Sequence, residues 1–186
     1  MKRIGLLLCA FLLLTGCSGK GKELDRAMEL RRKLLGASEC SFRAEITADY
    51  GDKVHSFTMA NCSDRNGDVR FTVDKPDSIA GITGSIGHSG GELTFDDTAL
   101  AFPLMADGQL APVCAPWLLM KTLQSGYLTS AGMEGELLRI TIDDRYEENA
   151  LTADIWVNDE NLPVRAEFCW QGRSILTILV EDFRIG

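Results

Sequence analysis

The chain has 186 residues and a formal net charge of -8, with 27 acidic residues against 19 lysines and arginines. Such an acidic surface would repel nucleic acid, which excludes a nucleic-acid-binding protein, and it offers no electrostatic attraction to anionic lipid. The length allows one domain with a core of its own and is too short for two.

The first sixteen residues have the three-part layout of a secretory signal. Lys2 and Arg3 precede an apolar stretch from Ile4 to Leu14, which the small pair Thr15-Gly16 follows. As a helix this stretch would span only about 16 Å, roughly half of a bilayer core, so it is too short for a permanent transmembrane anchor. We expect residues 1–16 to direct export and then to be removed.

Leu14-Thr15-Gly16-Cys17 resembles the lipobox of bacterial lipoproteins, in which the cysteine is acylated and the signal is cut immediately before it. The resemblance implies that Cys17 becomes the first residue and carries several acyl chains, palmitate among them, each stabilising membrane attachment by roughly 0.8 kcal/mol per buried methylene. The alternative is an ordinary cysteine beside an ordinary cleavage site. Residues 17–22 would be the lipidated N-terminus and a flexible tether. We therefore expect a lipid-anchored protein on the extracytoplasmic face of a bacterial cell membrane.

The domain itself begins with a predicted amphipathic helix. Apolar residues recur at helical spacing from Glu23 to Leu35, and Gly36 is a natural stop. From Phe42 to Ala48 the apolar residues alternate with polar ones, which predicts a strand with one buried face. Turn signals at Gly51-Asp52 and Asn66-Gly67 then divide the chain into three antiparallel strands, roughly 40–50, 53–63 and 68–74.

The remaining sequence predicts more strands around a second helix. Short irregular strands are expected between Ile79 and Phe102, and a helix from Pro112 to Ser125. Four strands with short gaps follow, at 136–143, 150–157, 162–171 and 174–183. This order predicts one α+β domain over residues 23–186. Its strongly curved antiparallel sheet, an incomplete β-barrel, would wrap around the N-terminal helix and the inserted helix.

This arrangement resembles the LolA and LolB superfamily of lipoprotein-localisation factors, including its membrane-tethered LolA-like lipoproteins. The likeness is carried by the lipobox followed by a helix, by Phe71-Thr72-Val73-Asp74-Lys75-Pro76, and by the ending from Leu162-Pro163-Val164 to Glu181-Asp182-Phe183. In that superfamily the hollow of an incomplete β-barrel takes acyl chains, so the resemblance implies a hydrophobic cavity without assigning its residues. In the tethered relatives of spore-forming bacteria the same fold serves as a protein-binding module.

Eight apolar residues are candidates for contact with a ligand, because the strand and helix patterns turn them inward. For any single one, ordinary core is the more frequent role of such a residue. The eight are Phe42, Ile46, Phe71, Val73, Trp117, Leu118, Phe168 and Trp170. The leading hypothesis is a non-enzymatic, membrane-anchored protein that binds a lipid or a lipid-modified protein. The alternative is a filled half-barrel that binds a partner protein at the cell surface, or acts as a sensor, through an outer apolar patch including Phe57, Met59 and Trp156.

Other motifs give no catalytic, metal or cofactor site. Gly87-His88-Ser89-Gly90-Gly91 fits the G-x-S-x-G pattern of a hydrolase nucleophile, but the catalytic histidine should follow the serine, and both histidines, His55 and His88, precede it. The cysteines and histidines lack the spacing of metal ligands.

Four cysteines beyond Cys17 make an even set in an exported protein, which favours disulfides. If a three-residue loop, Tyr50-Gly51-Asp52, joins the first two strands, Cys40 faces Cys62 and can form a cross-strand bridge. By elimination Cys114 would pair with Cys169. A register shifted by one would instead match Phe57 and Met59 to the first strand and separate Cys40 from Cys62.

Overall fold

The computed structural model describes residues 20–96, 98–106, 109–143 and 151–186. The predicted signal, Cys17 and residues 18 and 19 of the tether lie outside the described residues. Within the described part, no helix is long and apolar enough to cross a membrane.

The N-terminal helix, α2 (Lys20–Gly36), begins three residues before the predicted start. Its first turn therefore takes in residues 20–22, which were expected to belong to the flexible tether. Lysine is a good helix former, and one glycine in an exposed first turn costs about 1 kcal/mol or less, so nothing in Lys20-Gly21-Lys22 stops the helix. Of the six apolar residues at helical spacing, Ala27, Leu30 and Leu34 form the buried stripe, whereas Leu24, Met28 and Leu35 are exposed.

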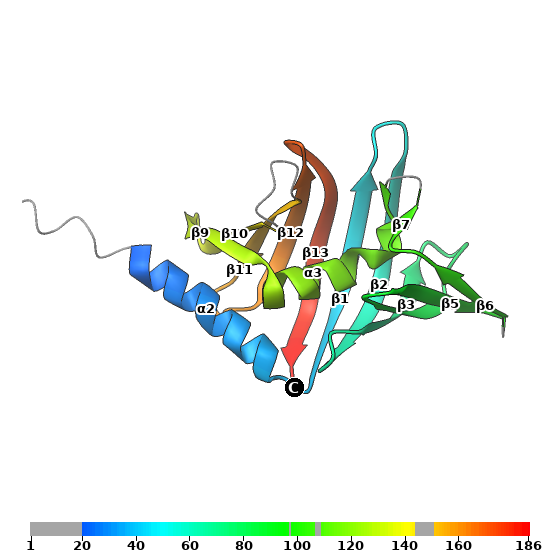
Figure 1. The fold of residues 1–186 in the computed structure, drawn as a ribbon, viewed down its shortest axis with the longest axis horizontal. Coiled ribbons are helices and arrows are strands. Elements are labelled where there is room, and N and C mark those ends of the chain that lie inside the picture. Colours follow the sequence, from blue (N-terminus) through cyan, green and yellow to red (C-terminus); the bar gives the residue numbers. More distant parts are fainter. Residues whose placement is uncertain (1–19, 97, 107–108, 144–150) are drawn as a thin grey trace, which may run out of the picture.

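The sheet contains eleven strands, each antiparallel to its neighbours, and it does not close into a barrel. The spatial order is β6-β5-β4-β3-β2-β1-β13-β12-β11-β10-β9, so the last strand, β13, lies beside the first, β1 (Figure 1). Their bounds are β1 (Glu39–Asp49), β2 (Val54–Asp64), β3 (Val69–Lys75), β4 (Thr83–Gly87), β5 (Gly90–Phe95), β6 (Thr98–Phe102), β9 (Tyr127–Glu134), β10 (Leu137–Asp143), β11 (Thr152–Val157), β12 (Pro163–Trp170) and β13 (Arg173–Ile185). A separate two-stranded sheet pairs β7 (Met105–Ala106) with β8 (Gln109–Leu110).

The second helix, α3 (Ala115–Ser125), follows a short 3₁₀ turn, η1 (Pro112–Cys114), and crosses the concave side of the sheet (Figure 1). The inward residues of β1 share that side, and Ala44, Ile46 and Ala48 are fully buried there. The predicted fold class is confirmed: a curved, open antiparallel sheet with one N-terminal and one inserted helix.

The register of the first hairpin differs from the one that favoured a disulfide. A two-residue turn, Gly51-Asp52, joins β1 to β2, and the Tyr50 N–H donates to the Lys53 carbonyl at 3.0 Å. Gly51 takes φ +97°, as a two-residue hairpin turn requires of its first central residue. Cys40 therefore lies opposite Ser63, and Met59 opposite Ala44, which is the shifted alternative.

Neither predicted disulfide is present in the structure, in which Cys40, Cys62, Cys114 and Cys169 are free thiols. Cys40 is buried on the inner face opposite Ser63, so the neighbouring Cys62 points to the outer face, where Arg70 Nη2 lies 3.7 Å from its sulfur. Cys114 is fully buried at the start of α3. Cys169 lies on the outer face, near enough to Asp154 and Glu167 to feel their charge, so the sheet separates it from Cys114.

Candidate functional site

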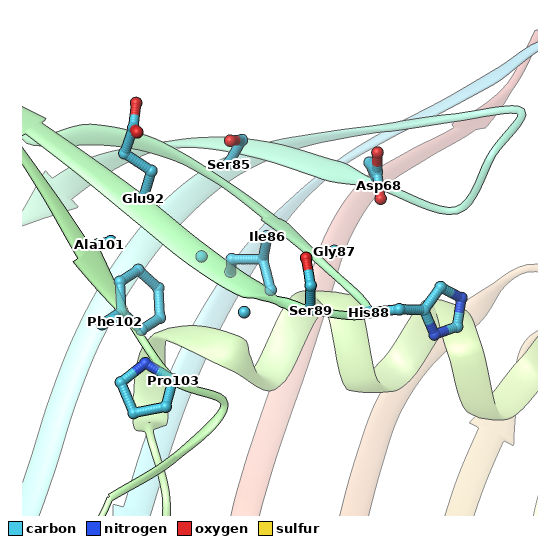
Figure 2. A pocket seen from close by; sticks show the side chains of 12 residues that line it. Asp68, Ser85, Ile86, Gly87, His88, Ser89, Glu92, Ala101, Phe102 and Pro103 are labelled. Carbon is cyan, nitrogen blue, oxygen red and sulfur yellow. The ribbon is translucent and has the colours of Figure 1, made fainter.

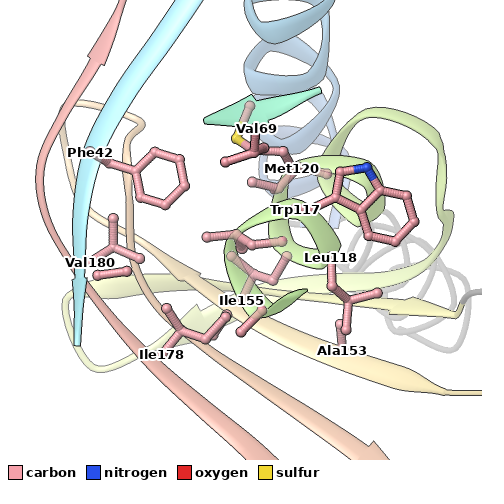
Figure 3. Close-up of a cluster of buried hydrophobic side chains, with 14 of the residues drawn as sticks. Phe42, Val69, Trp117, Leu118, Met120, Ala153, Ile155, Ile178 and Val180 are labelled. Atoms are coloured by element: carbon pink, nitrogen blue, oxygen red, sulfur yellow. The ribbon is translucent and has the colours of Figure 1, made fainter. Parts of the chain in front are cut away.

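Seven of the eight candidate ligand-binding residues lie in one continuous core on the concave face of the sheet, each at most 5% exposed. They are Phe42, Ile46, Phe71, Val73, Trp117, Leu118 and Phe168. Figure 3 shows this core, in which residues of α3 such as Trp117 and Leu118 lie among residues of the sheet. Residues far apart in the sequence are thus brought together as predicted.

The eighth candidate, Trp170, is not part of this core and is 46% exposed. It is the last residue of β12 and lies opposite Arg173, the first residue of β13. The register shift after Phe168 leaves its extra residue, Ile175, on β13, so β12 keeps its regular alternation. Trp170 is therefore exposed at the end of its strand, which the alternation from Phe168 to Trp170 does not reveal.

Helix α3 fills the hollow of the half-barrel. All six residues from Ala115 to Met120 are buried, as in a helix that is covered on every side over this stretch. One side chain, Phe42, also stacks on Phe183 with ring centroids 5.3 Å apart. An apolar ligand could therefore contact the seven core residues only if α3 moved.

The C-terminal end of α3 is fastened to α2 by one arginine. Arg31 Nε donates to the Leu123 carbonyl and Arg31 Nη2 to the Gly126 carbonyl, both at 2.8 Å. The last carbonyls of a helix have no partner within it, so the half-buried guanidinium satisfies the Leu123 carbonyl of α3 together with that of Gly126, the residue after the helix. Burial lowers the pKa of Arg31 from its usual value, although the side chain stays charged.

Trp117 carries a buried polar atom that has no partner. Its Nε1 has no hydrogen-bond acceptor among the described residues, although indole N–H groups are usually bonded when buried. The ring meets His88 edge-on at 5.5 Å, and Lys121 Nζ lies 5.5 Å from its centroid. An acceptor oxygen brought by a ligand would be stabilised at this point of the hollow.

An open groove of about 830 Å³ lies between the β4–β5 turn and the end of β6 (Figure 2). Its wall includes Asp68, His88, Ser89, Phe102 and Pro103.

The G-x-S-x-G run forms part of that groove as a hairpin turn, with Gly87 opposite Gly90 and a strand on each side. A nucleophile elbow needs a strand followed by a helix. His55 lies near the start of β2 and is not among the residues that line the groove with Ser89. The structure thus gives Ser89 no histidine in a catalytic arrangement within the described residues, and no group of three or more potential metal ligands occurs there either.

The three residues expected to form an outer apolar patch, Phe57, Met59 and Trp156, do not form one. Met59 is fully buried in the core and Phe57, opposite Ile46, packs against it, because the observed register turns both inward. Trp156 does point outward but is only 8% exposed, since Arg139 and Arg165 cover its ring with their guanidinium carbons 5.6 and 4.8 Å from the centroid.

No family model matches the sequence, and no curated protein matches it. Solved structures do resemble the fold. A LolA superfamily protein from Nitrosomonas europaea is 13% identical with a TM-score of 0.44, over 86% of this chain and 93% of that chain. The lipoprotein LppX from Mycobacterium tuberculosis is 10% identical with a TM-score of 0.43, over 87% and 93%. A chain of the complex between the CwlD amidase and the GerS lipoprotein from Clostridioides difficile is 11% identical with a TM-score of 0.45, over 93% and 100%. All three TM-scores are below 0.5, so the LolA-like resemblance stays an expectation drawn from the sequence, and the fold class is established by the sheet topology of this chain.

Proposed function

We propose that the protein is a lipid-anchored, extracytoplasmic binding protein without catalytic activity, whose curved sheet takes a lipid or a lipid-modified protein in the space that α3 occupies. The observation that carries this proposal is α3 itself, a short helix that is apolar on nearly every side and is tied at its C-terminal end by Arg31. Displacing α3 would leave a hollow of similar shape, about 16 Å long for eleven residues.

The chemistry of the hollow suits an acyl ester better than a plain hydrocarbon. The walls are aliphatic and aromatic side chains, which favour acyl chains in proportion to the area removed from water. The unpartnered Nε1 of Trp117 would donate to an ester or amide carbonyl. The proposed anchor on Cys17 would keep the domain beside such ligands.

The ligand hypothesis is tested by native mass spectrometry of protein purified from membranes, together with binding of a hydrophobic fluorescent dye. Arg31→Met removes both hydrogen bonds to the end of α3, and a hydrogen bond to a charged group contributes about 1.5–3 kcal/mol. We expect dye affinity to rise on the order of tenfold, because less free energy opposes the opening of α3. Arg32→Met, at the exposed neighbouring position, is the matched control and should bind dye like the parent protein.

A protein with no copurified lipid, and with Arg31→Met binding dye no better than Arg32→Met, would contradict the ligand hypothesis. The anchor is tested separately, by the mass of the N-terminal peptide and by Cys17→Ser, which should release the protein from membranes.

A protein partner remains the second candidate, now at a different surface. β6 forms one edge of the described sheet, and Phe95 and Leu100 of the β5–β6 hairpin are 54% and 64% exposed. Unpaired strand edges can receive a strand from another protein. A photoreactive residue at Leu100 should then give one discrete protein adduct in cells, whereas the same residue at Val54, 61% exposed, should give none.

A further inference from the structure

The positive charge of the domain is concentrated on α2. Lys20–Gly36 contains six basic and three acidic residues, whereas residues 37–186 contain 11 basic and 24 acidic residues. The helix thus has a net charge of +3 and the rest of the domain -13. The expectation of a uniformly acidic surface, drawn from composition, does not hold for this helix.

The same helix exposes a line of apolar side chains, which we call the α2 strip: Leu24, Met28 and Leu35. They are 44%, 44% and 59% exposed. Spacings of four and seven residues place them on one side of the helix, over a length of about 16 Å. They are separate from Ala27, Leu30 and Leu34, which pack against the domain. Single exposed apolar residues are common on proteins, but three in line on a basic helix form a surface suited to an interface.

The charged side chains nearest the α2 strip are Arg32 and Asp25, about 80° and 100° around the helix from Leu24, and both are exposed. Glu29 lies further away, at about 140°, and is paired with Lys33, whose Nζ lies 3.1 Å from it. The attraction to an anionic surface therefore comes from the net positive charge of the helix as a whole, since Asp25 offsets Arg32 beside the strip.

Because α2 follows the proposed anchor Cys17 closely in the chain, a membrane is the surface nearest to the strip. Only three peptide steps separate Cys17 from Lys20, and an extended chain spans at most about 3.6 Å per residue. If Cys17 carries acyl chains, the first turn of α2 cannot be more than roughly 11 Å from the anchor. In Figure 1 that end of α2 lies at the edge of the molecule, where the helix extends beyond the sheet.

We infer that the α2 strip lies on an anionic lipid surface, with Leu24, Met28 and Leu35 in the headgroup layer and the acidic body of the domain facing away from the membrane. This inference rests on the proposed lipid anchor. Apolar burial and attraction to anionic headgroups act together on such helices, and the tether raises the local concentration of the surface. The charge of -13 on the remainder opposes any orientation that lays the sheet on the same lipids.

The inference is tested with acylated, full-length mature protein in vesicles of phosphatidylcholine containing one-third phosphatidylglycerol. A photoreactive amino acid replaces Met28 in one variant and Leu179, on β13, in the other; both native side chains are 44% exposed. We expect lipid adducts from position 28 to exceed those from position 179 at least several-fold. The excess should fall without phosphatidylglycerol and in about 1 M NaCl, where the Debye length is about 3 Å.

Each other outcome counts against the inference. If the two positions give equal amounts of lipid adduct while the protein still floats with the vesicles, the inference about the α2 strip is wrong. The proposed lipid anchor on Cys17 would be unaffected by that result. Protein adducts from position 28 would show that the strip binds another copy of the chain. A Cys17 peptide without acyl chains would overturn the anchor, and with it the inference.

Discussion

Trp156 lies on the outer face of the sheet, yet it is almost completely covered by its neighbours. Arg139 of β10 and Arg165 of β12 lie directly opposite it on the two neighbouring strands. Arg139 is held in turn by Asp154 at 2.7 Å. The guanidinium groups of the two neighbouring strands thus cover the indole ring. This large apolar side chain therefore stabilises the sheet and offers little surface to a partner protein.

We predict that Arg165→Met lowers the free energy of unfolding by about 0.5–1 kcal/mol, because it removes a cation from the face of the Trp156 ring while keeping most of the aliphatic contact. The measurement is urea unfolding in a double-mutant cycle with Trp156→Leu. A coupling energy of zero between the two positions would show that the contact does not stabilise the sheet.

The cysteines should divide into two pairs by reactivity. Burial raises the pKa of Cys40 to about 11 and that of Cys114 to about 12, so at pH 8 on the order of one Cys40 thiol in a thousand is ionised. Cys62 and Cys169 are only half-buried. We predict that iodoacetamide modifies these two in the native protein, without reductant, and reaches the other two only after unfolding.

Mass mapping of the alkylated peptides measures this pattern. Failure of any pair of cysteines to react without reductant, even in denaturant, would mean that a disulfide is present and that the first hairpin or the sheet is arranged differently.

At the scale of elements, the glycines of β4 and β9 have opposite roles. A Cβ on Gly84 would lie 2.3 Å from the Glu92 carbonyl oxygen of β5 and 2.6 Å from the Phe71 ring, whereas one on Gly132 would meet nothing within 4 Å. Glycine at position 84 thus permits close packing, and at position 132 only loosens the chain.

We predict that Gly84→Ala destabilises the protein by about 1–3 kcal/mol, since backbone of β5 must shift. Gly132→Ala should be neutral or stabilise by up to roughly 1 kcal/mol, because alanine restricts the unfolded chain. Thermal and urea unfolding of both variants measure the difference. Equal effects at the two positions would contradict the packing of β4 against β5 and Phe71.

The elements that could be predicted from the sequence are those whose side chains alternate or recur regularly. The alternation in β1 and the helical spacing in α2 predicted both elements within a few residues. β9 was not predicted, because its Ser130, Gly132 and exposed neighbours show no such alternation; it is a strand through its pairing with β10. Trp170 continues the alternation of β12, but it is the last residue of that strand and is exposed, which alternation alone does not reveal.

At the scale of the whole molecule, the residues of the core could be predicted from the sequence. Whether a helix or a ligand fills the hollow that they line could not. Apolar periodicity selects inward residues such as Phe42 and Phe168 in the same way whether a ligand or a helix faces them. That α3 fills the hollow depends on long-range packing and on the contact of Arg31 with Leu123. The basic character of α2, in contrast, could have been found by counting charges element by element.

The two buried thiols also make the stability of the whole domain depend on alkaline pH. An unfolded cysteine loses its proton near pH 8.5, whereas folded Cys40 and Cys114 keep theirs to about 11 and about 12. Above pH 9 the unfolded state therefore binds fewer protons than the folded state, and the free energy of unfolding falls as pH rises. The stabilisation is complete below the unfolded pKa and is lost progressively toward the folded pKa values.

We predict a decline of up to about 1.4 kcal/mol per pH unit for each thiol between pH 9 and 10. Urea unfolding across this range measures it, with the double variant Cys40→Ala and Cys114→Ala as the comparison. The variant loses apolar contacts and should be less stable at neutral pH, but its stability should fall less steeply with pH. Because only the slopes are compared, the cavity left by the substitutions does not affect the result. Parallel slopes would mean that the thiols are exposed enough to ionise in the folded protein, and would contradict the full burial of Cys114 at the start of α3.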